Sequence, residues 1–207
     1  YRDAKYVYPK HKSANGKKDF WARGDGWVLA GLAKVLKDLP KEFKHYDFFV
    51  DKYVRMAKAV ADIQQPGGYW TRSMMDPEHA PGPETSGTAF FTYGLLWGVN
   101  NGYLDEATYM PVIKKAWNYL KKTALQKDGR VGYVQPIGEK AIPGQIVDAN
   151  STANFGVGAF LLAACEYVRY LEAPVNKDRA YWANLLYNMA KPVLSNMAEG
   201  NLQKNMQ

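Results

Sequence analysis

Residues 20–27 read Phe20-Trp21-Ala22-Arg23-Gly24-Asp25-Gly26-Trp27. This stretch places an arginine between two tryptophans, just before an apolar segment with helical spacing. The glycines permit a sharp turn, so we expect a helix to begin near Gly26, with Asp25 or Gly26 as its cap. Arg23 would then lie at an opening, where a guanidinium between two indole faces suits a flat anionic ligand such as a sugar acid. In the alternative interpretation, both tryptophans are core, Arg23 pairs with a nearby carboxylate and Asp25 only caps.

Apolar residues at helical spacing predict six helices, in which buried helices alternate with amphipathic ones at intervals of roughly sixty to seventy residues. Helical hairpins that cannot bury their own faces must stack on their neighbours. We therefore predict an all-α chain, a single domain over 1–207, that forms an α/α toroid of three hairpins, about half of an (α/α)6 barrel. Its stacking surface should be open at both ends. The buried helices are expected at 26–39, 86–99 and 153–171, the amphipathic helices at 46–64, 106–125 and 177–189, and a short strand at 69–72.

The net charge of +7 favours the approach of anionic ligands. No nucleic-acid partner is expected, because most basic residues are scattered over helix faces. The exception is a cluster around the turn signal Asn15-Gly16. No apolar run reaches the roughly twenty residues that span a bilayer, so no membrane partner is expected. The basic cluster consists of Lys10, His11, Lys12, Lys17 and Lys18.

Three segments resemble a known family. They are Trp-x-Arg-Gly-Asp-Gly-Trp at 21–27, Glu-Thr-Ser-Gly-Thr-Ala at 84–89 and Asn-Gly-Tyr-Leu-Asp at 101–105. Together they resemble the unsaturated rhamnogalacturonyl hydrolases of glycoside hydrolase family 105, and the related unsaturated glucuronyl hydrolases of family 88 share the Trp-x-Arg element. The resemblance implies a barrel of six α-hairpins that removes a 4,5-unsaturated uronic acid from lyase-generated pectin or rhamnogalacturonan oligosaccharides. It also implies a bacterial periplasmic or cytoplasmic setting.

The resemblance further implies that this chain is the C-terminal part of a longer polypeptide, with the N-terminal half as its partner. The family's catalytic aspartate lies well upstream of the Trp-x-Arg element and has no match here. We therefore expect the chain alone to be inactive. Asp25 is the fallback catalyst, but a neighbouring Arg23 would lower its pKa, which favours a role as cap or sugar acceptor over that of an acid.

Substrate recognition is what the resemblance transfers to this chain, with Trp21 and Trp27 as walls and Arg23 as the contact to an acidic oligosaccharide. The loops before the buried helices, at 21–27, 76–88 and 144–156, are expected to form one rim of the central cavity. Further substrate contacts are expected from Glu84, Asn150 and Ser151, and helix capping is the competing role at these places.

Neither a metal nor a cofactor is expected. The histidines are far apart in sequence and form no His-Glu-x-x-His pattern. A second hypothesis is that the chain is a non-catalytic carbohydrate-binding or scaffold α/α repeat, which uses the same aromatic rim but catalyses no reaction. Three further upstream hairpins with an aspartate facing the cavity would favour the enzyme.

Overall fold

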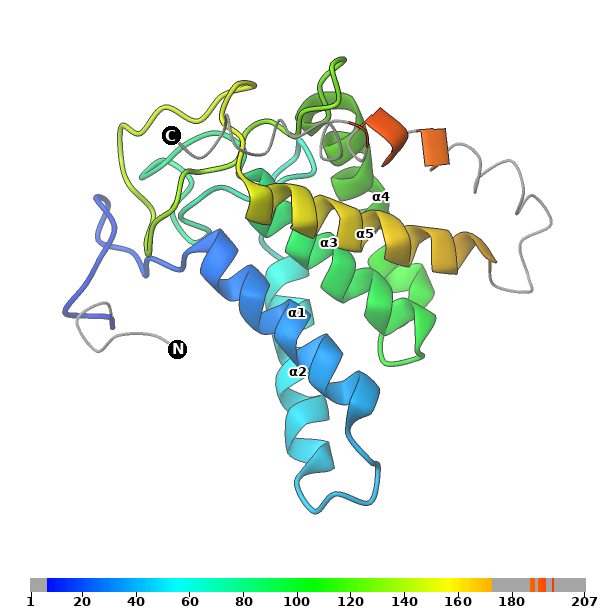
Figure 1. The fold of residues 1–207 in the computed structure, drawn as a ribbon. Helices are drawn as coiled ribbons and strands as arrows, with labels where there is room; N and C mark the ends of the chain where they lie inside the picture. Colours follow the sequence, from blue (N-terminus) through cyan, green and yellow to red (C-terminus); the bar gives the residue numbers. More distant parts are fainter. Residues whose placement is uncertain (1–6, 173–186, 189, 193–194, 196–207) are drawn as a thin grey trace.

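The computed structural model describes residues 7–172, 187–188, 190–192 and 195, and its regular elements are helices (Figure 1). Helices α1, α3 and α5 run side by side in one direction, with α3 in the middle. Helix α2 packs against α1 and α3, and α4 packs against α3. The all-α class is therefore confirmed. The elements are α1 (Ala22–Asp38), α2 (Tyr46–Ala61), α3 (Thr85–Asn100), α4 (Glu106–Tyr119), the π-helical segment η2 (Leu120–Ala124) and α5 (Asn154–Glu172).

Helix α3 is the centre of the core. Every residue from 85 to 98 is buried, as expected for a helix that is apolar on nearly all sides. The neighbouring helices each turn one face toward it. From α2, the buried Tyr53 donates its hydroxyl hydrogen to the carbonyl oxygen of Gly94 at 2.6 Å. This bond satisfies a polar group that would be costly to bury alone.

Glycines let α1 and α3 cross closely. A Cβ built on Gly26 would lie 2.9 Å from the Cβ of Phe90, and one built on Gly87 would lie 2.8 Å from the backbone of Ala22. A larger residue at either position would force the helices apart. Gly26 therefore serves helix packing. The expectation that it helps the chain turn before a helix is wrong.

The helix boundaries differ from the expected ones mainly at α1. It begins at Ala22, four residues before the expected start, so Asp25 lies in its first turn and is not a cap. The expected strand at 69–72 is absent, and Thr71 forms only an isolated bridge with Pro83. Helix α4 gives way to the wider η2 turn after Tyr119. Most of the helix expected at 177–189 lies outside the described residues.

The loops gather at the end of the molecule where α1, α3 and α5 begin (Figure 1). Backbone hydrogen bonds join them: the Ala22 amide donates to the Arg72 carbonyl, and the Thr85 amide donates to the Tyr133 carbonyl. The helices therefore enter the core from one connected set of loops, which we call the rim. In the part of the chain that the structure describes, no helix is both long enough and apolar enough to cross a membrane.

Candidate functional site

The helix α1 begins at the rim without a side-chain cap. Trp21 precedes it in an extended conformation and forms a bridge with Ser73. The Ala22 amide, which has no partner within the helix, donates to the Arg72 carbonyl at 3.0 Å. A loop carbonyl thus does what Asp25 was expected to do, which explains why the helix can start four residues early.

Arg23 is buried, with 3% of its surface exposed, and faces the protein interior. Its guanidinium donates to the carbonyl oxygens of Gln135 at 2.6 Å and Pro136 at 2.8 Å, and more weakly to the Ser86 hydroxyl at 3.5 Å. The nearest carboxylate, Glu84, is 3.9 Å away. Burial lowers the pKa of Arg23, and the charge of Glu84 opposes this shift.

The aromatic rings on either side of the guanidinium are not the expected pair. Arg23 lies 4.7 Å from the ring centroid of Trp21 and 4.4 Å from that of Phe155. Trp27 instead packs on Phe90 and is 53% exposed. The expectation that Arg23 lies at an opening between two tryptophans is therefore wrong. Tertiary contacts decide this: although Trp27 follows Arg23 by one helical turn, its ring packs on Phe90 of α3, whereas the guanidinium reaches Phe155 of α5.

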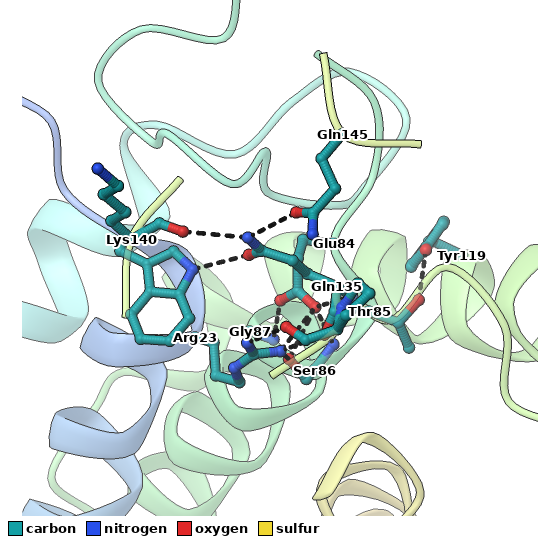
Figure 2. A network of polar contacts seen from close by, with 11 residues as sticks. Arg23, Glu84, Thr85, Ser86, Gly87, Tyr119, Gln135, Lys140 and Gln145 are labelled. Carbon is teal, nitrogen blue, oxygen red and sulfur yellow. Dashed lines mark hydrogen bonds and ion pairs between the residues drawn. The ribbon is translucent and has the colours of Figure 1, made fainter. Parts of the chain in front are cut away.

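Glu84 is the hub of the buried polar network in Figure 2. Its carboxylate accepts hydrogen bonds from the amides of Ser86 and Gly87, from the Ser86 hydroxyl, and from the Gln135 amide at 3.1 Å. It is therefore the N-cap of α3, which is the competing role that the sequence offered at this place. A fully buried carboxylate with these donors is held in one position.

Gln135 joins this network to the rim, and sequence reasoning missed it. Its side-chain oxygen accepts from the Trp21 indole at 2.8 Å, and its side-chain nitrogen donates to the Lys140 carbonyl and to the Gln145 side chain (Figure 2). Gln135 fixes the plane of the indole and the path of the following loop. No local pattern marks it, since its partners lie up to 114 residues away in sequence.

Asn150 and Ser151 lie in an exposed turn that closes on Asp148. The Asp148 carboxylate accepts from both of their amides, and the Asn150 side chain accepts from Arg130 at 3.2 Å. Helix α5 begins later, at Asn154, so the turn does not cap it. Substrate contacts by Glu84, Asn150 and Ser151 stay predictions. The same holds for Arg23, whose contact with a ligand would require the two loop carbonyls to give way.

Two open pockets, of about 540 and 700 Å³, lie away from the rim. Both include Glu106, at the start of α4, and the first also reaches the last turns of α1 and α5 through Lys37 and Tyr170. They therefore lie at the end opposite the predicted site. Among the described residues, no group of three or more histidine, cysteine or acidic side chains is arranged to hold a metal ion.

Comparison with known sequences identifies a family and relatives that the chain matches over part of their length. The model described as Glycosyl Hydrolase Family 88 matches residues 1–171. An unsaturated 3S-rhamnoglycuronyl hydrolase of Formosa agariphila is 43% identical over 175 residues, which are 83% of this chain and 45% of that relative. The chain thus spans less than half the length of the curated relatives that it matches.

Solved structures agree on the fold. A protein described as a polysaccharide lyase is 75% identical, with a TM-score of 0.80 over 85% of this chain and 50% of its own. A family 88 glycosyl hydrolase from Bacteroides vulgatus is 68% identical, with a TM-score of 0.79 over 83% and 49%. A family 105 glycoside hydrolase of C. acetobutylicum matches at 28% identity, with a TM-score of 0.61 over 80% and 50%. The expected α/α toroid is confirmed. Family 88, expected as the related family, is the one whose model matches.

Proposed function

Because the chain belongs to glycosyl hydrolase family 88, we propose that it forms part of a glycoside hydrolase. The proposed enzyme releases terminal 4,5-unsaturated uronic acid from lyase-generated pectin or rhamnogalacturonan oligosaccharides. Besides the family, the observation that carries the proposal is the exposed indole of Trp27 in the second turn of α1, close to the end that enters the rim. An exposed indole offers an apolar face on which a sugar ring can stack.

The reaction would be a hydration of the double bond. An acid protonates the enol ether, water adds to the resulting oxocarbenium-like carbon, and the hemiketal opens to release the remaining sugar. One carboxyl group that acts first as acid and then as base suffices. We propose that this group lies outside the chain and that the residues of the chain bind and orient substrate. In this proposal Arg23 does not contact the substrate. Its guanidinium instead holds the Trp21 ring and the carbonyl groups of residues 135 and 136 in place.

We also propose that the rest of a longer polypeptide covers the open face of α1. Val28 and Val35, seven residues apart and therefore on one face, lie exposed along this helix, although its other face is core. Large apolar side chains that follow one helix face mark a contact surface. The covering segment would be the remaining half of the ring, since this chain spans 45% of a curated relative's length.

The test compares the 207-residue chain with a polypeptide extended to the length of its relatives. Each is incubated with unsaturated pectin disaccharide, and loss of ultraviolet absorbance by the double bond is followed. We expect decay with the extended protein only. Decay with the chain alone would refute the missing-acid argument. Binding without decay in the extended protein would favour the non-catalytic carbohydrate-binding alternative.

A variant pair tests the role of Trp27 in the extended protein. Trp27→Ala should raise KM about five- to tenfold, because one aromatic stacking surface is lost. Val35→Ala removes a side chain from the same exposed face, nearer the other end of α1, and serves as the control. Equal changes in KM for both variants would assign Trp27 to packing.

A further inference from the structure

Residues 7–20 form a strongly basic segment, which we call the basic arm. It carries four lysines within nine residues, Lys10, Lys12, Lys17 and Lys18, and all four are exposed. The arm contains one acidic residue, Asp19, which is buried. The surface of the arm therefore has one sign of charge, which neither the fold nor the proposed reaction explains.

Buried groups hold the arm in one place. Its turn closes between Ser13 and Lys17, whose backbone groups bond at 3.0 Å, with Gly16 at a positive φ of 76°. This confirms the turn expected at Asn15-Gly16. The turn then docks on the loop before α3: the Asn15 side chain donates to the buried Asp76 at 3.0 Å.

His79, in the loop before α3, adds a further attachment. The Ala14 amide donates to its Nδ1 at 2.9 Å, and its Nε2 lies 3.9 Å from the Asp19 carboxylate. Within the arm, Nε2 of His11 lies 2.8 Å from the same carboxylate. None of these contacts uses a lysine ammonium group. The arm is thus anchored by its turn and by His79, while the lysines remain on the outside.

Most of the lysine charge is not neutralised nearby. Lys17 lies 3.7 Å from Asp76. Within the described part of the chain, Lys10, Lys12 and Lys18 make no ion pair, and Lys12 lies 5.6 Å from the ring centroid of Tyr8. Three ammonium groups on one ordered segment create a local positive potential that attracts anions.

The arm leads directly into the rim. Its last residue, Phe20, accepts a backbone hydrogen bond from Met74, and Trp21 follows at the start of α1. In Figure 1 it is the dark blue segment beside the beginning of α1. The ends of α1, α3 and α5 that meet at the rim are the positive ends of their dipoles. The lysines therefore extend a positive field outward from the candidate site.

We propose that the basic arm binds the anionic groups of sugar units beyond the terminal uronate, so that the preferred substrate is a polyanionic oligosaccharide longer than a disaccharide. This inference rests on the proposed function and deepens it. The shared chemistry is a carboxylate or sulfate ester at a distance from the cleaved bond. Lysine ammonium groups suit either, since they act as mobile point charges.

The test measures binding by the 207-residue chain, so that it does not depend on turnover. The arm variant is Lys10→Gln with Lys12→Gln and Lys18→Gln. The matched control is Lys37→Gln with Lys41→Gln and Lys44→Gln, three exposed lysines at the opposite end of α1. Circular dichroism checks that both variants fold. Calorimetry measures binding of a lyase-generated uronate tetrasaccharide, with and without sulfate esters, and of the unsaturated disaccharide.

We expect the arm variant to bind the tetrasaccharide roughly five- to tenfold more weakly than the wild-type chain at low ionic strength. The loss should vanish near about 0.5 M salt, where charges are screened. The control variant and the disaccharide should show less than about a twofold change. A larger loss with the sulfated tetrasaccharide identifies sulfate as the group bound, and an equal loss identifies carboxylate.

Three results would overturn the inference: no binding of tetrasaccharide by the wild-type chain, equal losses in the arm and control variants, or arm-dependent binding of a single-stranded DNA oligomer that is tighter than that of the tetrasaccharide. The proposed function fails separately, when the extended protein leaves the disaccharide double bond intact.

Discussion

The chain makes the same turn twice and continues differently each time. At the end of the α2 hairpin, Gly68 has a φ of 86°, its amide bonds to the Gln65 carbonyl, and the Gln65 amide bonds to the Tyr69 carbonyl. Gly129, after η2, has a φ of 83° and repeats the pattern with Gln126. The first turn leads to a sealed loop before α3, and the second leads to an open loop before α5.

The two loops differ in what they bury. The sealed loop places Arg72, Asp76 and Glu84 in the interior, each with hydrogen-bond partners. The open loop leaves Ile137 88% exposed and Ile146 80% exposed. Turn geometry therefore sets where each loop starts. The elements that pack around the loop decide whether its polar side chains are buried and hydrogen-bonded. The sealed loop buries three charged side chains, whereas the open loop presents Ile137 and Ile146 to solvent.

The largest expected effect is the removal of the carboxylate at the centre of the sealed loop. Glu84→Ala takes away the α3 cap and leaves Arg23 buried without its nearest counter-charge, so we expect a loss of about 3–5 kcal/mol in the free energy of unfolding. Urea denaturation measures it. The matched change in the open loop, Asp148→Ala, removes a cap from an exposed turn and should cost about 1 kcal/mol or less. Equal losses would show that the two loops do not differ as described.

The next effect separates backbone strain from packing in the repeated turn. Gly68→Ala places a Cβ at a positive φ and against the carbonyl group of Lys115 in α4, whereas Gly82→Ala has the same strain at a φ of 88° with open space around it. We expect about 1 kcal/mol for Gly82→Ala and about 2–4 kcal/mol for Gly68→Ala. Thermal and urea unfolding of both variants check this.

The equivalent glycine sharpens the test. A Cβ on Gly129 would lie 2.7 Å from the Pro192 carbonyl oxygen, so Gly129→Ala should resemble Gly68→Ala more than Gly82→Ala. Should Gly68→Ala cost no more than Gly82→Ala, the first turn would not be pressed against α4, and the similarity of the two turns would be one of φ alone.

The smallest effect concerns acid. Burial raises the pKa of Asp76, but hydrogen bonds from Ser13 and Asn15 and the charge of Lys17 together bring it below its ordinary value of 3.8. Because the pKa of Asp76 is lower in the folded than in the unfolded state, its ionised carboxylate stabilises the fold at pH values above the ordinary pKa of 3.8. This stability is lost as the pH falls through the folded pKa.

Asp76→Asn should therefore lower the free energy of unfolding by about 1–2 kcal/mol near neutral pH and flatten its fall below about pH 4. Asp128→Asn, in the second turn, is the control. Hydrogen bonds from Arg130 lower the pKa of Asp128 as well, but its side chain is 54% exposed, so the change should stay within about 0.5 kcal/mol. Urea unfolding across the acid range measures both, and identical pH profiles would contradict the contrast between the loops.

Local patterns predicted the helices well. Four of the five described α-helices begin within one residue of the expected position, because apolar spacing and turn signals act over a few residues. The start of α1 was missed because two closely spaced glycines, Gly24 and Gly26, are as typical of a turn as of a helix packed closely on a neighbour. What requires a glycine at position 26 is the nearness of Phe90 on α3, and periodicity carries no information about that neighbour.

The candidate site was predicted less well. The competing interpretation of the stretch at 21–27 holds in part: Arg23 is buried 3.9 Å from the Glu84 carboxylate, but Trp27 is exposed and Asp25 is not a cap. The actual partners of Arg23, the carbonyls of Gln135 and Pro136 and the ring of Phe155, are more than a hundred residues away. Gln135 itself carries no local signal. The roles that depend on such contacts could not be derived from spacing.

The sequence by itself determined the order and approximate bounds of the helices and the repeated glycine turns. Each of these follows from residues close together in the chain, where hydrophobic spacing and backbone freedom act. The sequence motifs led first to a related family, 105, while the matching family is 88. Only the tertiary structure decided that Arg23 faces inward, that Glu84 caps α3, and that the basic arm is anchored beside the rim. Those outcomes depend on burial and on hydrogen-bond partners from distant loops, which exist only once the helices have packed.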